Sequence, residues 1–185
     1  PCISDPGEPL VQLCHQLGVP MEVVPGPSAA IAALAISGQH TSRFAFEGFL
    51  SVNRNQRAAH LEQLRDEQRT MIFYEAPHKL CRTLADMAAV FGGDRSLSLC
   101  RELTKIHEEV QLTTFAQAIA YYENTPPRGE YVLVVAGAVP QKAESITLEE
   151  AVEQVRRCVA DGQKLTQACK TVAAETGYRK SELYD

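Results

Sequence analysis

The stretch RTMIFYEAPHKLCRTLADMAAVFGG, residues 69–93, joins a strand-like segment directly to a helix-like one. The segment 69–76 carries a continuous apolar run, which is typical of a strand covered on both faces. Pro77 suits the first turn of a helix, and apolar residues then recur at helical spacing until a glycine pair ends the run. A buried strand followed at once by an amphipathic helix is the repeating unit of an α/β domain.

This strand–helix unit recurs on both sides of the stretch. Further strands are predicted over 43–50, 95–103 and 129–139, and further helices over 53–68 and 113–125. We therefore predict an α/β fold whose mixed, largely buried sheet lies within residues 26–139. A helix over 10–18 and a strand over 21–26 precede it, and we assign residues 1–25 to the remnant of an N-terminal α/β domain.

The chain changes character after Pro140. Two amphipathic helices are predicted over 147–162 and 164–177, and the first opens with a Thr and a Glu spaced for a capping box. We assign residues 140–185 to a helical tail that resembles a helix-turn-helix segment. Such a tail suits contact with nucleic acid, and it equally suits packing or dimerisation.

Composition and charge place the chain among soluble globular proteins. Of its 185 residues 45% are hydrophobic and 22% charged, and the net charge of −5 argues against a broadly basic nucleic-acid-binding surface. No run approaches the roughly 18 apolar residues that a membrane-spanning helix needs. Six cysteines without zinc-ligand spacing predict reduced thiols and no metal site, which suits a cytoplasmic protein. Because the sequence opens without an initiator Met, we interpret it as a piece of a longer polypeptide.

Charged side chains follow two of the predicted buried strands. Glu75 ends one strand, and Arg101, Glu102 and Lys105 lie at the end of the next. Ligands of open α/β sheets collect at the carboxyl ends of strands, so we expect these residues to wall a cleft. The alternative is a buried ion-pair network in which Arg101 bonds Glu75 or Glu130, because unpaired charges on such strands would be costly.

A sharp turn and a small-sided helix occupy residues 24–39, VPGPSAAIAALAISGQ. Ser28 stands at a helix N-cap position, with a hydroxyl free to accept a backbone N–H. The alanines that begin at Ala29 let other atoms come close to the backbone. This helix is therefore either packed against the sheet or pressed against a ligand.

Basic residues gather in the loop after strand 43–50 and in the neighbouring helices: Arg54, Arg57, Arg65, Arg69, Lys79 and Arg82. Arg54 and Arg57, within the loop SVNRNQR, are suited to charge-assisted hydrogen bonds with phosphates. The alternative for this loop is an ordinary solvated surface.

Six segments, taken in order, resemble the tetrapyrrole methylase superfamily and within it the ribosomal RNA small subunit methyltransferase I group. The segments are PCISDPG (1–7), VPGPSAA (24–30), FEGFL (46–50), RTMIFYEAPHKL (69–80), CRELTKIHEE (100–109) and GEYVLVV (129–135). Single motifs of this kind are weak signals, whereas six in the same order and spacing are a strong one.

The resemblance implies an enzyme that uses S-adenosylmethionine to methylate the 2′-oxygen of a cytidine ribose in the decoding region of 16S ribosomal RNA. It also implies a homodimer, and a cofactor held in the cleft between two α/β domains. The glycine-rich first strand of the family has no counterpart here, so part of the cofactor wall is expected to lie outside this chain.

The resemblance further assigns roles to individual residues. The cofactor would be bordered by Pro1, Ser28, Ala29, Tyr74, Glu75, Leu103, Val132 and Leu133. For such a reaction we place Glu75, Arg101, Glu102 and Lys105 on the catalytic side, with Arg101 or Lys105 as the electrostatic partner of the reacting oxygen, because a carboxylate or a cation assists the loss of the hydroxyl proton. For contact with the RNA we expect Arg54 and Arg57, because of their suitability for phosphates.

Two other functions fit the same residues. A methylase of a corrin or porphyrin precursor would share the fold, although it has no need of the helical tail or of the basic loop. A non-catalytic RNA-binding module would use the tail as its reader and would not bind the cofactor.

Overall fold

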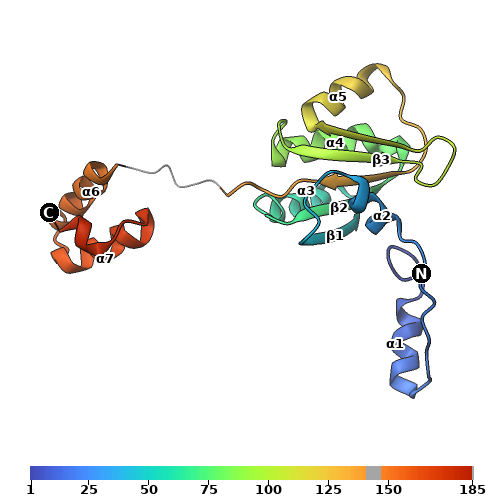
Figure 1. The fold of residues 1–185 in the computed structure, drawn as a ribbon, viewed down its shortest axis with the longest axis horizontal. Coiled ribbons are helices and arrows are strands. Elements are labelled where there is room, and N and C mark those ends of the chain that lie inside the picture. The colour runs from blue at the N-terminus through green and yellow to red at the C-terminus, as the bar shows by residue number, and fades with distance from the viewer. Residues whose placement is uncertain (141–146, 185) are drawn as a thin grey trace. The chain divides into compact units, whose positions relative to one another are not determined.

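The computed structural model describes residues 1–140 and 147–184. The chain divides into two compact units, Pro1–Val139 and Pro140–Asp185 (Figure 1). The first unit is built on one five-stranded sheet, which confirms the predicted mixed α/β fold. Its strands are β1 (Phe44–Phe49), β2 (Thr70–Glu75), β3 (Ser96–Arg101), β4 (Glu109–Thr114) and β5 (Tyr131–Val135).

The strand order is β1-β2-β5-β3-β4. β1 and β2 are parallel, whereas β5 runs antiparallel to both β2 and β3 between which it lies. β2 and β3 therefore point the same way on either side of β5. Their carboxyl ends and the amino end of β5 meet at one edge of the sheet.

Helices cover both faces of the sheet. α3 (Arg54–Gln63), α4 (Pro77–Phe91) and α5 (Phe115–Asn124) share one core cluster with alternate strand residues such as Phe73 and Leu133. α2 (Ala29–Ile36) packs on the other face, against Ile72 and Val134. Because successive side chains of a strand point to opposite faces, each buried strand contributes to both clusters.

One strand was not predicted from the sequence, and one predicted strand is absent. β4 was not foreseen, because it is an edge strand with polar residues and its exposed side chains blur the alternation. The strand predicted over 21–26 does not form. Val23 and Val24 are 89% and 88% exposed there and pair with no strand among the described residues. The helix that precedes them, α1 (Glu8–Leu17), has no buried residue.

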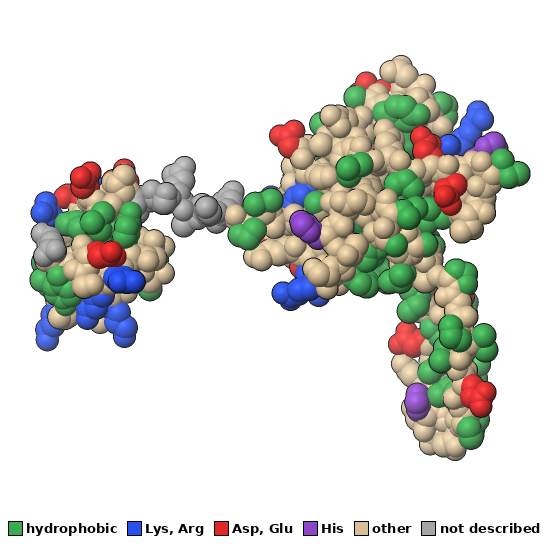
Figure 2. Space-filling model, viewed as in Figure 1, with side chains coloured by type: hydrophobic (Ala, Val, Ile, Leu, Met, Phe, Trp, Pro, Cys, Tyr) green, Lys and Arg blue, Asp and Glu red, His purple; other side chains and the backbone are tan. Residues whose placement is uncertain are grey.

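The second unit is a small helical assembly. α6 (Leu148–Ala160), α7 (Leu165–Thr176) and the short 3₁₀ helix η1 (Lys180–Leu183) bury a common apolar cluster that includes Val155 and Cys169. The predicted capping box between Thr147 and Glu150 is confirmed at the start of α6. Acidic and basic side chains are interspersed on the visible face of this unit (Figure 2).

Candidate active site

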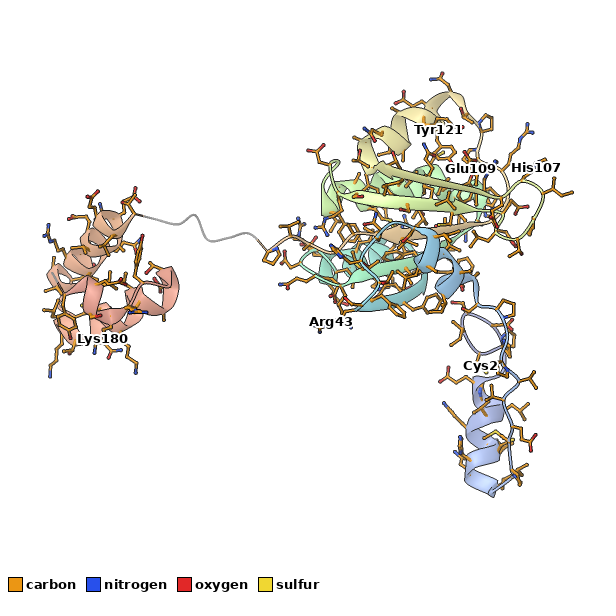
Figure 3. All side chains as sticks on the ribbon, in the orientation of Figure 1. Cys2, Arg43, His107, Glu109, Tyr121 and Lys180 are labelled. Atoms are coloured by element: carbon orange, nitrogen blue, oxygen red, sulfur yellow. The ribbon has the colours of Figure 1, made fainter. Side chains whose placement is uncertain are left out.

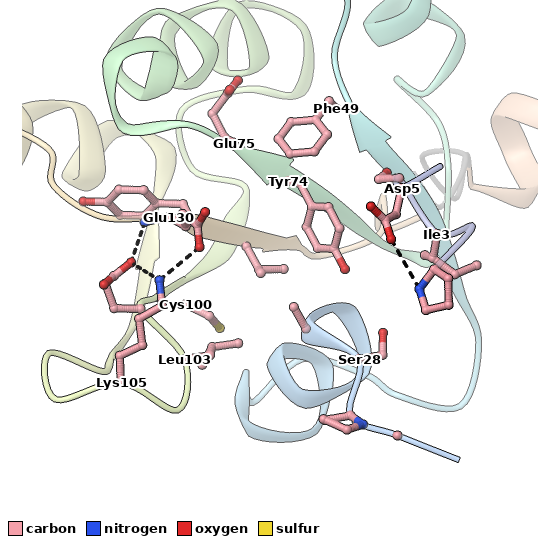
Figure 4. A pocket seen from close by; sticks show the side chains of 18 of the residues that line it. Ile3, Asp5, Ser28, Phe49, Tyr74, Glu75, Cys100, Leu103, Lys105 and Glu130 are labelled. Carbon is pink, nitrogen blue, oxygen red and sulfur yellow. Dashed lines mark hydrogen bonds and ion pairs between the residues drawn. The ribbon is translucent and has the colours of Figure 1, made fainter. Parts of the chain in front are cut away.

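A cavity of about 970 Å³ opens at the edge where β2, β5 and β3 end, and we call it the main cavity (Figure 4). Glu75 of β2 and Arg101 of β3 both pair with Tyr131 of β5, so the sheet register brings the three strand ends level. The N-terminal segment and the turn before α2 complete its wall. This is the place that the strand-end argument predicts for a ligand.

Most of the predicted site residues line this cavity: Pro1, Ser28, Ala29, Tyr74, Glu75, Glu102, Leu103, Lys105 and Val132. Leu133 does not, because the period-two alternation of β5 turns it into the core on the opposite face, where it is fully buried. Arg54, Arg57 and Arg101 also lie outside the cavity wall.

The start of α2 is capped by Tyr74 rather than by Ser28. Ser28 occupies the N-cap position, but its side chain makes no capping hydrogen bond within the part of the chain that the structure describes. Instead the backbone N–H of Ala30 donates to the phenolic oxygen of Tyr74 at 3.1 Å. The ring of Tyr74 is held edge-on by Phe46 and Phe49, with centroids 5.1 and 5.5 Å away. The Ser28 hydroxyl points into the cavity (Figure 4).

An ion cluster stands at the opposite wall. The Nζ of Lys105 lies 2.9 Å from Oε1 of Glu102 and 3.0 Å from Oε2 of Glu130. The Glu102 carboxylate also accepts the backbone N–H of Glu130 at 2.9 Å. That backbone bond, and next the Lys105 ammonium, lower the pKa of Glu102, while Glu102 raises the pKa of Lys105. Both groups therefore stay charged through the neutral pH range.

Backbone conformation holds this cluster in place. Glu102 and Thr104 have positive φ angles of 50° and 65°, which are uncommon for residues with side chains. Gly129, at φ +77°, lies under the Glu102 side chain, and a Cβ at this position would collide with it. The loop after β3 is therefore shaped around the Glu102 carboxylate.

The Glu75 carboxylate is buried and fully engaged. It is 5% exposed, and its two oxygens accept the Ala76 N–H at 2.8 Å and the Thr83 hydroxyl at 2.5 Å. Thr83 lies two turns into α4, and no local pattern in the sequence signals that its hydroxyl reaches back to the strand end.

Arg101 pairs with a residue that the sequence did not suggest. Nη2 of Arg101 lies 2.8 Å from Oε2 of Glu109 on the adjacent strand β4. Arg101 therefore forms its ion pair with Glu109, and not with the predicted partners Glu75 or Glu130. Its Nε is buried without a hydrogen-bond partner among residues 1–140 and 147–184. Arg101 is thus ion-paired as the alternative predicted, but its partner differs, because β4, which was not predicted, places the Glu109 carboxylate beside it.

The two arginines of the basic loop are placed differently. Arg54 is exposed at the first position of α3. The Arg57 side chain is 6% exposed and bonds Asp86 of α4 at 2.7 Å. Its Nη1 also donates to the backbone carbonyls of Ser51 and Val52.

Some apolar residues of the cavity wall were not predicted from the sequence. Phe49 and Cys100 are examples, and burial raises the pKa of the Cys100 thiol to about 11, so that it stays neutral. All six cysteines are free, and only Cys100 and Cys169 are buried. No group of three or more metal-binding side chains occurs among the described residues, and no helix among them is long and apolar enough to cross a membrane.

Comparison with known proteins settles the family. The model of the tetrapyrrole (corrin/porphyrin) methylases matches residues 1–119. The chain belongs to this family. Two curated relatives, from Synechocystis and Mycobacterium tuberculosis, are 44% and 42% identical over the whole chain, and both are named ribosomal RNA small subunit methyltransferase I. The chain spans 66% and 64% of their lengths.

Solved structures agree on the fold. The methyltransferase CobJ superposes with a TM-score of 0.52 at 19% sequence identity, covering 71% of this chain and 56% of that one. At this identity the likeness concerns the fold alone. Together with the curated relatives, it confirms the family resemblance and the fold class expected from the sequence.

Proposed function

We propose that the full-length methylase transfers a methyl group from S-adenosylmethionine to the 2′-oxygen of a cytidine ribose in 16S ribosomal RNA. The observation that carries this proposal is the main cavity, whose wall gathers nine of the residues predicted for cofactor and catalysis. The names of the relatives, at 44% and 42% identity, support the ribosomal substrate. We further propose that the protein acts as a homodimer in the cytoplasm.

The residues of the cavity fit the cofactor. Cys100, Leu103 and Val132 offer an apolar surface for an adenosine, and the free Ser28 hydroxyl and small Ala29 allow close approach to backbone. When bound, S-adenosylmethionine supplies a methyl group on a positively charged sulfonium, which is reactive toward an oxygen nucleophile. The wall residues would orient it and exclude water, so that positioning lowers the barrier.

Lys105 is the best-placed electrostatic partner of the reacting oxygen. A ribose hydroxyl is a poor acid, so a cation that stabilises the developing alkoxide assists the reaction. Lys105 faces the cavity and is oriented by Glu102 and Glu130, whereas Arg101 is bonded to Glu109 outside the cavity wall. The Glu75 carboxylate is bonded to Thr83 and to the Ala76 N–H and points toward α4, so we do not propose it as the group that receives the proton.

Calorimetry, analysis of ribosomal RNA and one variant of the full-length protein test this function. Calorimetry should register binding of S-adenosylmethionine, and mass spectrometry of 16S ribosomal RNA from a strain that lacks the gene should show one missing ribose methyl group. Lys105→Met should lower methyl transfer by about 100-fold while cofactor binding persists. Near-normal turnover of that variant would remove Lys105 from the mechanism.

The same measurements separate the two other functions. A non-catalytic RNA-binding module would give no heat with the cofactor. A methylase of tetrapyrrole precursors would bind the cofactor but leave ribosomal RNA methylation unchanged when its gene is deleted. The helical tail and the basic loop favour the ribosomal substrate over a small molecule.

A further inference from the structure

A second, smaller hollow of about 70 Å³ lies where the loop after β1 meets the start of α4, and we call it the Arg57 hollow. Its wall consists of Leu50, Ser51, Val52, Arg57, Glu75, Lys79, Arg82 and Thr83. Three of these side chains are cationic and one is a carboxylate. The hollow has room for a compact group such as a phosphate and none for a nucleoside.

The guanidinium of Arg57, a residue of the hollow's wall, has an unused hydrogen-bond donor. Its Nε and Nη1 are bonded to Asp86 and to two backbone carbonyls, but its Nη2 is buried and has no partner in the described part of the chain. A buried N–H without an acceptor costs about 1–3 kcal/mol, so such groups are normally satisfied. An acceptor supplied from outside the chain would satisfy it.

Two more cations of the hollow are also available. Lys79 is half-buried, and within residues 1–140 and 147–184 it has neither an ion pair nor a side-chain hydrogen bond. Arg82 is 60% exposed and only loosely placed near Asp86, at 3.9 Å. The one carboxylate in the wall, Glu75, is already held by Thr83 and the Ala76 N–H. The positive end of the α4 dipole adds to the attraction for an anion.

The position of the hollow links it to the main cavity. Glu75 contributes to the walls of both, so the two sites adjoin at the end of β2. A nucleotide whose ribose enters the main cavity has its phosphates within reach of a neighbouring site. We propose that the Arg57 hollow binds one phosphodiester of the RNA substrate, next to the ribose that is methylated; this rests on the proposed function.

Charge substitutions in the full-length protein test the site. With 16S ribosomal RNA as the probe, Lys79→Gln and Arg82→Gln should each weaken binding about tenfold and lower the slope of log K against log salt by about one. Arg43→Gln is the matched control, because this exposed arginine stands just before the first residue of β1 (Figure 3). The hollow is formed by the loop after the last residue of β1, at the other end of the strand. Equal effects of the three substitutions would overturn the site in favour of a diffuse positive field.

A probe that needs no methyl transfer distinguishes this inference from the proposed function. The dinucleotide CpC carries one phosphodiester, and its titration should shift the guanidinium NMR signals of Arg57 saturably, with weaker binding in Lys79→Gln. If CpC binds in this way but ribosomal RNA is not methylated, the phosphate site stands and the proposed function fails. Unshifted Arg57 signals at millimolar CpC would overturn the phosphate site, whatever the enzyme methylates.

Discussion

Single side chains at the cavity form hydrogen bonds between segments that are far apart in the sequence. The Tyr74 phenol is the clearest case, because it belongs to β2 and accepts a hydrogen bond from the first turn of α2, 44 residues earlier in the chain. The side chain of Tyr74 thereby caps the start of α2, a role that the N-cap residue Ser28 does not fill. The hydroxyl of Ser28 is free for a ligand as a result.

Replacing Tyr74 by Phe should destabilise the protein by about 1 kcal/mol, because the Ala30 N–H loses its acceptor while ring packing is kept. Urea denaturation measures the change. Tyr121→Phe is the matched control, since this tyrosine is 45% exposed and its ring contact with Tyr122 does not need the hydroxyl. Equal stability of the Tyr74→Phe variant and the wild type would contradict the capping role.

The ion pair between Glu67 and Arg69 should stabilise the folded state in a pH-dependent way. The Glu67 side chain is 18% exposed, and hydrogen bonds from Arg69 lower its pKa from 4.5 to about 2. A lowered pKa stabilises the fold above the unfolded value, and this stabilisation is lost as the pH falls from about 4.5 toward 2. Glu67→Gln should therefore cost about 1 kcal/mol at pH 7, the upper range for a surface pair, and progressively less as the pH falls from about 4.5 through about 2. A difference that does not change with pH would refute this assignment.

At the scale of elements, the loop after β3 and the lead into β5 form one structure. Glu102 accepts the Glu130 N–H, and its own N–H donates to the Glu130 carbonyl at 3.0 Å. Gly129 makes this exchange possible, since a side chain there would occupy the place of Glu102. The ion cluster of the main cavity depends on that contact.

Gly129→Ala should displace Glu102 and with it Lys105, at a cost of about 2 kcal/mol from steric overlap and a positive φ. In the full-length protein we expect methyl transfer to fall at least as far as in Lys105→Met. Gly162→Ala has a comparable φ of +93° but no atom near its Cβ position, so it controls for backbone strain alone. Wild-type activity in Gly129→Ala would show that the cluster is dispensable.

At the scale of the whole molecule, the two units have separate apolar cores. The sheet unit buries its own side chains on both faces, and the helical unit buries a cluster around Val155, Cys169 and Leu183. The main cavity and the Arg57 hollow lie within Pro1–Val139. Cofactor binding and the integrity of the helical unit should therefore be separable.

Val155→Asp places a charge in the helical core and should unfold this unit, because an unpaired buried carboxylate costs several kcal/mol. Calorimetry of the full-length variant should show unchanged binding of S-adenosylmethionine. Its affinity for 16S ribosomal RNA should fall if the tail reads RNA. Val159→Asp serves as control, because Val159 is 39% exposed on the same helix. Loss of cofactor binding in Val155→Asp alone would contradict the independence of the units.

Apart from the edge strand β4 and the absent strand over 21–26, the sequence by itself determined the order of strands and helices, the cap of α6 and the strand end that carries Glu75, because periodicity and capping are local properties. Tertiary structure alone decided the strand order, the face to which Leu133 turns, and the partners of Arg57 and Arg101. Those pairings join residues on separate elements, and they follow from sheet register and helix packing, which no short stretch of sequence specifies.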